Sequence, residues 1–147
     1  MKIIVLLIIL CICGFMGWQF QKYYKNRTKI YSDLIEFCVY CKNQISFLNN
    51  DKQNLISSFL SKRESLISET LYGKNQRNLN EEENGEIIQF INNIGKFDVE
   101  GELQNIEYYS SLFMLKKEKC QKEESTIGVM CLKLGWLLGL LLCIVLY

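Results

Sequence analysis

The chain has 147 residues, 49% hydrophobic and 22% charged, and its 17 basic and 16 acidic residues give a formal net charge of +1. This near balance leaves no broad basic surface for nucleic acid. The sequence contains no histidine, which removes the commonest general base and metal ligand and argues against most hydrolase and oxidase chemistry. We therefore expect a protein that is not an enzyme, with no cofactor, no metal, no small-molecule substrate and no nucleic-acid partner.

Residues 1–21 are predicted to form an N-terminal transmembrane anchor. The uncharged run within them has roughly 18 residues, about the length with which a helix crosses the hydrocarbon core. A cleaved signal peptide is the alternative, because Lys2 gives a basic start, and it would leave an exported or single-pass helical protein. No Ala-x-Ala-like cleavage site follows, however, and the bulky side chains of Trp18 and Phe20 extend the run beyond a normal signal core.

Residues 22–126 are predicted to form a helical domain, because apolar residues recur there at three- and four-residue spacing without a strand-like alternation. The absence of proline permits long helices, and we expect the first of them to be continuous with the first span. Asp51 is the expected cap of a shorter helix, and Asn80 with the glutamates after it predicts a capping box. Asp98 is expected to cap the longest helix, which runs without a breaker towards the C-terminal segment.

The seven cysteines of the chain are interpreted as packing residues in a reducing compartment. A metal site needs about four ligands, and no histidine is available to complete one. Cys38 and Cys41 form a Cys-x-x-Cys pair inside a helical pattern, without the βαβ pattern that accompanies redox motifs of this kind. A thiol-redox protein that uses these two residues is the alternative.

Residues 127–147 are predicted to form a C-terminal transmembrane helix. From Leu134 onwards no side chain is charged, and the earlier turns bring the helix to a full span with Lys133 near the headgroups. Four small residues recur at every fourth position and predict a ridge for close helix packing in lipid: Cys131, Gly135, Gly139 and Cys143. Since glycine is common in membrane helices, the ridge also has a simpler explanation.

Basic residues flank both predicted spans on the side of the middle region. The positive-inside rule therefore places residues 22–126 in the cytoplasm and both termini outside. The main determinants of this orientation are Lys22, Lys25, Arg27, Lys29 and Lys133. The resulting fold class is all-α, a small helical bundle carried on two long helices that continue into N- and C-terminal transmembrane segments.

Three stretches of this sequence resemble the stage III sporulation protein AB family of endospore-forming bacteria, and one of them is Gln44-Ile45-Ser-Phe followed by Leu55-Ile-Ser-Ser-Phe-Leu. The stretch from Lys133 onwards is similar to the family's closing hydrophobic segment with its Leu-Gly-x-x-x-Gly pattern. Gly95, Asp98 and Gln104 are similar to a second family pattern, with one extra residue between Asp98 and Gln104, and we interpret them as a candidate partner-facing turn. Local capping by Gly95 and Asp98 is the simpler reading of this turn.

The resemblance implies a scaffold or platform subunit of the sporulation channel that joins the mother cell to the forespore. It also implies a helical domain similar to the platform proteins of type II secretion and type IV pilus systems. The implied partners are the stage III sporulation ATPase, protein AA, and other membrane subunits of the same complex. The implied location is the mother-cell membrane around the forespore, with the helical domain in the cytoplasm.

Overall fold

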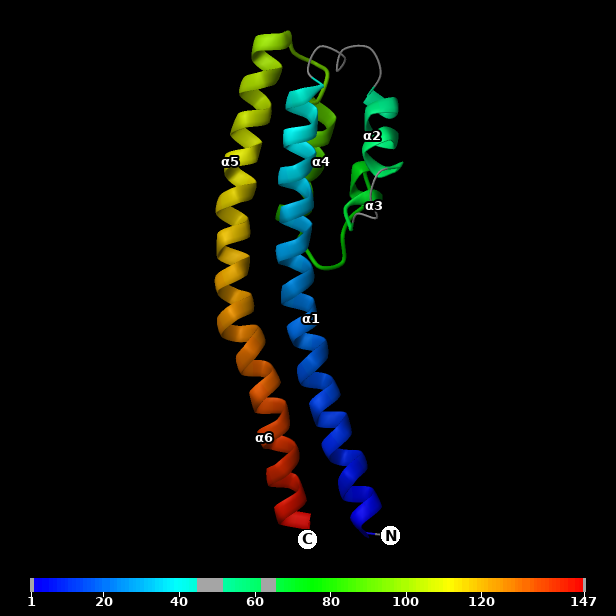
Figure 1. Cartoon of the computed structure of the whole chain (residues 1–147), viewed down its shortest axis with the longest axis vertical. Helices are drawn as coiled ribbons and strands as arrows, with labels where there is room; N and C mark the ends of the chain where they lie inside the picture. Colours follow the sequence, from blue (N-terminus) through cyan, green and yellow to red (C-terminus); the bar gives the residue numbers. More distant parts are fainter. Residues whose placement is uncertain (1, 45–51, 62–65, 147) are drawn as a thin grey trace. The chain divides into compact units, whose positions relative to one another are not determined.

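The computed structural model describes residues 2–44, 52–61 and 66–146 of the chain (Figure 1). Its elements are α1 (Lys2–Asn43), α2 (Lys52–Ser61), α3 (Ser68–Leu71), α4 (Glu81–Asn93), α5 (Val99–Glu123), the π-helical segment η2 (Glu124–Gly128) and α6 (Val129–Leu146). The described residues contain no strand, so the predicted all-α class is confirmed.

The two long helices that the sequence predicts are present. Helix α1 is unbroken over 42 residues, because no proline or glycine interrupts it after Gly17. Helices α5, η2 and α6 follow one another without a gap, and Val99–Val145 is the one helix of the described residues that is long and apolar enough to cross a membrane. The span that we predict within α1 stays a prediction.

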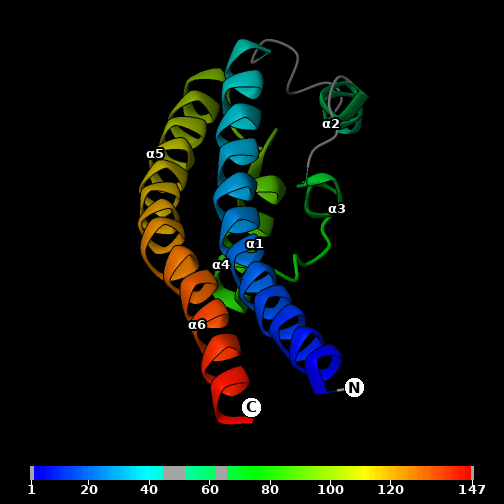
Figure 2. The same cartoon turned by 60° about the horizontal axis from the view of Figure 1, so that its bottom comes forward.

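The chain divides into two compact units. The first, called the terminal unit here, contains residues 1–28 and 119–147, and the second, called the bundle unit, contains residues 29–118. In the terminal unit the first half of α1 and α6 lie side by side, as Figures 1 and 2 show. Both views also show α4 beside α1 and α5 within the bundle unit.

Aromatic side chains fill the core of the bundle unit. The ring of Phe90 on α4 lies 4.8 Å from that of Tyr109 and 5.5 Å from that of Phe113, both on α5. Phe37 on α1 lies 5.1 Å from Phe59 on α2, which attaches the shorter helix to the core. These contacts bury the apolar stripes that helical spacing places on each element.

The local capping predictions are confirmed where the structure describes them. The side chain of Asn80 accepts from the Glu83 amide at 2.7 Å, and the Glu83 carboxylate accepts from the Asn80 amide at 3.1 Å. The side chain of Asp98 accepts from the amide of Gly101 at 3.2 Å, as expected of the N-cap residue of α5. The predicted cap at Asp51 lies outside the described residues.

A short π-helical segment precedes α6. It covers residues 124–128, so the predicted span of residues 127–147 includes its last two residues and α6, which begins at Val129. The sequence has no proline there, and the change consists only of a shift in the backbone hydrogen-bond pattern of a continuous helix.

Candidate functional site

In the terminal unit, α1 and α6 approach each other at glycine residues, and we call this contact the glycine seam (Gly14, Gly17, Gly135 and Gly139). A side-chain carbon built on Gly135 would lie 2.8 Å from the carbonyl oxygen of Cys13 and 3.3 Å from the Cα atom of Gly17. A carbon built on Gly17 would lie 3.0 Å from the carbonyl oxygen of Cys131. The two backbones are therefore too close for any side chain larger than hydrogen at these positions.

The seam continues above and below this crossing. A carbon built on Gly139 would lie 3.3 Å from the Cβ atom of Cys13, and one built on Gly14 would lie 3.3 Å from the indole ring of Trp136. Each helix thus supplies glycines against which a side chain of the other helix packs. Such an arrangement increases van der Waals contact, which drives helix association where no water is present.

The structure places the four residues of the sequence-predicted ridge as follows. Gly135 lies in the seam and is half-buried, and Gly139 is buried. Cys131 is half-buried and contributes its backbone carbonyl, and Cys143 is half-buried near the end of α6. The ridge as an assembly surface for a partner stays a prediction. Gly14 and Gly17 were not predicted as contact residues, although their three-residue spacing is a signal in the sequence.

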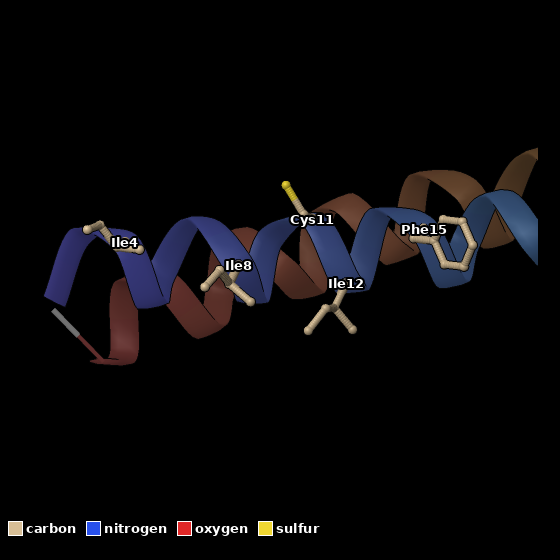
Figure 3. Close-up of a pocket in the computed structure, with 5 residues that line it drawn as sticks. All are labelled: Ile4, Ile8, Cys11, Ile12 and Phe15. Carbon is tan, nitrogen blue, oxygen red and sulfur yellow. The ribbon is translucent and has the colours of Figure 1, made fainter. Parts of the chain in front are cut away.

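Apolar pockets lie on the described residues of α1 and α6, and two of them are described here by their lining. The larger, of about 500 Å³, lies on α1 among Ile4, Ile8, Cys11, Ile12 and Phe15, shown in Figure 3. The smaller, of about 220 Å³, runs beside the seam. Its walls come from both helices: Cys13, Met16, Gly17, Phe20, Cys131, Leu134, Gly135 and Leu138. Exposed apolar side chains of this kind fit contact with lipid chains or with another membrane helix.

The basic residues that we assigned to orientation differ in their surroundings. The ammonium of Lys22 lies 5.3 Å from the ring centre of Trp18, within the range of a cation–π contact. Arg27 donates to the Glu123 carboxylate at 3.0 Å, which ties α1 to the end of α5 within the terminal unit. Lys25, Lys29 and Lys133 are exposed.

The second candidate site is the turn between α4 and α5, residues 94–102, which we call the α4–α5 turn. Gly95 has a φ of 80°, and its amide donates to the Glu102 carboxylate at 3.1 Å. Asp98 caps α5 in the same turn. Glu102 closes the turn through this hydrogen bond, and Gln104 lies further along α5 with an exposed side chain. The partner-facing role of Gly95, Asp98 and Gln104 stays a prediction. Glu102 was not predicted as part of this turn, because its 2% exposure depends on tertiary packing.

Cys38 and Cys41 lie in the bundle core with 1% and 0% of their surfaces exposed. Burial raises the pKa of the Cys38 thiol to about 12 and raises that of Cys41 as well. Both thiols are free and stay protonated at neutral pH, whereas the thiolate is the reactive form. This environment suits packing residues and disfavours the thiol-redox alternative.

An all-α fold, one long apolar helix and a close helix pair define a small membrane-associated helical protein. The chain belongs to the stage III sporulation protein AB family, whose profile matches residues 63–147, more than half of its length. The resemblance that the sequence motifs indicated is thereby confirmed, and the chain is a sporulation-associated membrane protein. The comparisons with curated proteins and with solved structures gave no match.

Proposed function

We propose that this protein is a non-enzymatic platform subunit of the sporulation channel, a secretion-like complex between the mother cell and the forespore. In this role its helical bundle docks the cytoplasmic ATPase, stage III sporulation protein AA, and its membrane helices contact neighbouring subunits. The family match over residues 63–147 carries the proposal, because it includes both the bundle helices α4 and α5 and the apolar helix α6.

The proposed orientation supports this role. Lys22, Lys25 and Lys133 lie near the ends of the apolar segments, and their positive charge favours retention of the flanking region in the cytoplasm. The bundle unit then faces the compartment that contains ATP, and the protein resides in the mother-cell membrane around the forespore.

The orientation is tested by labelling engineered cysteines in a variant whose native cysteines are replaced. Residues 75 and 147 receive the single cysteines, and a thiol reagent that does not cross lipid is applied to intact cells. We expect labelling at residue 147 and none at residue 75 until the cells are opened. Labelling at residue 75 in intact cells would place the bundle outside the cytoplasm. The bundle could then not bind a cytoplasmic ATPase.

The mass of the protein isolated from membranes gives an independent measurement. The full-length mass supports an uncleaved anchor, and the loss of residues 1–21 would support the exported alternative. Direct binding of purified protein AA to the full chain in lipid nanodiscs then tests docking itself.

A further inference from the structure

The α4–α5 turn holds two exposed apolar side chains in a fixed position. Phe97 is 46% exposed and Val99 is 57% exposed. Gly95, before them, adopts a φ of 80°, which residues with side chains rarely adopt. After them, a carbon built on Gly101 would lie 2.7 Å from the Asp98 carboxylate and 3.2 Å from the Cβ atom of Phe97. The turn therefore favours glycine at position 95 by its backbone conformation, and a side chain at position 101 would have to displace Asp98 or Phe97, which lies against the first turn of α5.

The buried carboxylate of Glu102 holds the backbone of this turn. One oxygen of Glu102 accepts from the Gly95 amide, and the other oxygen is buried without a hydrogen-bond partner among the described residues. Lys52 is close enough for Glu102 to affect its pKa, but its ammonium donates to the carbonyl of Ile91. A buried carboxylate oxygen without a donor is costly, and such groups in folded proteins call for an explanation.

The charge of the turn is acidic. Residues 95–102 contain one basic residue, Lys96, and three acidic ones, Asp98, Glu100 and Glu102. The carboxylates of Asp98 and Glu100 are exposed on either side of Val99. The surface thus combines an exposed aromatic ring with negative charge, and its backbone is fixed before any partner arrives, which lowers the entropy cost of binding.

We propose that the α4–α5 turn is the surface by which the bundle binds its partner, and that the partner presents an apolar pocket for Phe97 beside an arginine or lysine. This inference rests on the proposed function, since it names the contact through which the ATPase docks. A cation placed over the turn is attracted by Asp98 and Glu100 and by the unpaired oxygen of Glu102.

Other exposed apolar residues of α5 lack these features. Tyr108 is 64% exposed and Leu115 is 67% exposed, but both lie on a regular stretch of helix. Single exposed apolar side chains are common on protein surfaces and need no partner. Tyr108 therefore serves as a control for Phe97, and the exposed Glu118 on the same helix serves as a control for Glu100.

The test measures the affinity of purified protein AA for the full chain in nanodiscs of phosphatidylethanolamine and phosphatidylglycerol, by biolayer interferometry at low and high salt. We expect Phe97→Ala to weaken binding about tenfold, as the loss of an interface anchor does. Glu100→Lys should weaken it by a similar factor at low salt and less at high salt, because screening reduces charge attraction. Tyr108→Ala and Glu118→Lys should leave the affinity within about twofold.

Glu102→Gln tests the buried charge, because the amide oxygen of glutamine still accepts from Gly95. We expect weaker binding with a thermal unfolding midpoint that is the same or higher, because the substitution removes a buried oxygen that has no donor. If the unaltered chain binds protein AA and the Phe97, Glu100 and Glu102 variants bind it equally well, the docking function is supported. The α4–α5 turn is then not the binding surface. Equal weakening by the control variants would also overturn the inference. If the unaltered chain does not bind protein AA, the docking function fails together with the surface.

Discussion

The carbonyl oxygen of Cys13 would lie 2.8 Å from a Cβ atom built on Gly135. This separation is shorter than any that a real Cβ atom keeps, so a residue with a side chain at position 135 would push the helices apart. Since the same crossing includes Gly17, each helix contributes one glycine where the two backbones meet. The terminal unit is therefore sensitive to single carbon atoms at this crossing.

Gly135→Ala is expected to destabilise the terminal unit by about 1–3 kcal/mol, the usual range for overpacking a close contact. Both tryptophans of the chain, Trp18 and Trp136, belong to this unit, so their fluorescence reports its unfolding in detergent or nanodiscs. We expect a lower unfolding midpoint and a shifted emission maximum for the variant.

Gly85→Ala provides the matched control, because it adds the same carbon to a helix interior where nothing lies within 4 Å. Alanine is a better helix former than glycine, so this change should stabilise α4 by about 0.5–1 kcal/mol, measured by circular dichroism. A loss of stability at Gly85 equal to that at Gly135 would show that the seam geometry is not the cause.

The π-helical segment η2 brings the glycines of α6 into the seam. Cys120 and Gly128 are both buried, eight residues apart, whereas Ile127 is 39% exposed. In a regular α-helix a seven-residue step returns to within about 20° of the same face, and an eight-residue step overshoots it by about 80°. The π-helical segment therefore accommodates one residue more than a regular α-helix would between these buried positions. As a result Gly135 faces α1.

Deletion of Ser125 should consequently be tolerated, because it converts η2 into regular α-helix while the phase of α6 is kept. Insertion of one alanine after Ser125 should instead rotate α6 by about 100° and turn Gly135 away from α1. We expect the fluorescence of Trp136, whose indole ring lies against Gly14, to be unchanged in the deletion and shifted in the insertion, measured in a Trp18→Phe background. Equal spectra in the two variants would contradict the assigned role of η2.

Much of this fold is encoded in local patterns that the sequence shows directly. The capping box at Asn80 and the cap at Asp98 depend on side chains within three residues of the amides they bind, so they were predictable. The long helices follow from apolar spacing and the absence of proline. The family resemblance was carried by the glycines and apolar residues of the last segment.

The features that escaped prediction depend on contacts between elements. Asn84 and Glu102 read as ordinary polar positions of amphipathic helices, and only packing shows that they are 4% and 2% exposed. Gly14 and Gly17 are contact residues only because α6 packs against them, and α6 lies more than a hundred residues further along the chain. The start of η2 carries no proline or glycine, so its hydrogen-bond shift leaves no signal in composition.

Asn84 closes the loop before α4, and its replacement should destabilise the bundle unit. Its side-chain oxygen accepts from the Gln76 amide at 2.8 Å, and its nitrogen donates to the carbonyls of Gln76, Leu79 and Asn80. Asn84→Ala leaves the Gln76 amide and the Leu79 carbonyl without this partner, whereas the carbonyls of Gln76 and Asn80 keep backbone amides as donors. We expect a cost of about 1–3 kcal/mol, which denaturant unfolding followed by circular dichroism measures. The exposed Glu82→Ala is the control and should cost less than about 0.5 kcal/mol.

The buried thiol of Cys38 predicts that the bundle unit loses stability at alkaline pH. Its pKa is raised by burial from 9.0 to about 12, so above pH 9 the unfolded chain releases a proton that the folded chain retains. The folded state binds more protons there, and stability therefore falls as the pH rises from about 9 towards 12. Burial raises the pKa of Tyr109 and acts in the same direction, whereas burial lowers that of Lys52 and acts in the opposite one.

The contribution of the thiol is isolated by comparing the chain with its Cys38→Ala variant. We expect the variant to be less stable at neutral pH, because a buried atom is lost, but to lose less stability between about pH 8 and pH 10.5. Val39→Ala, at an exposed and uncharged neighbour, should keep the pH dependence of the unaltered chain. Parallel curves for the chain and for Cys38→Ala would assign the alkaline loss to other groups, and rapid reaction of Cys38 with a thiol reagent at pH 8 would contradict its burial.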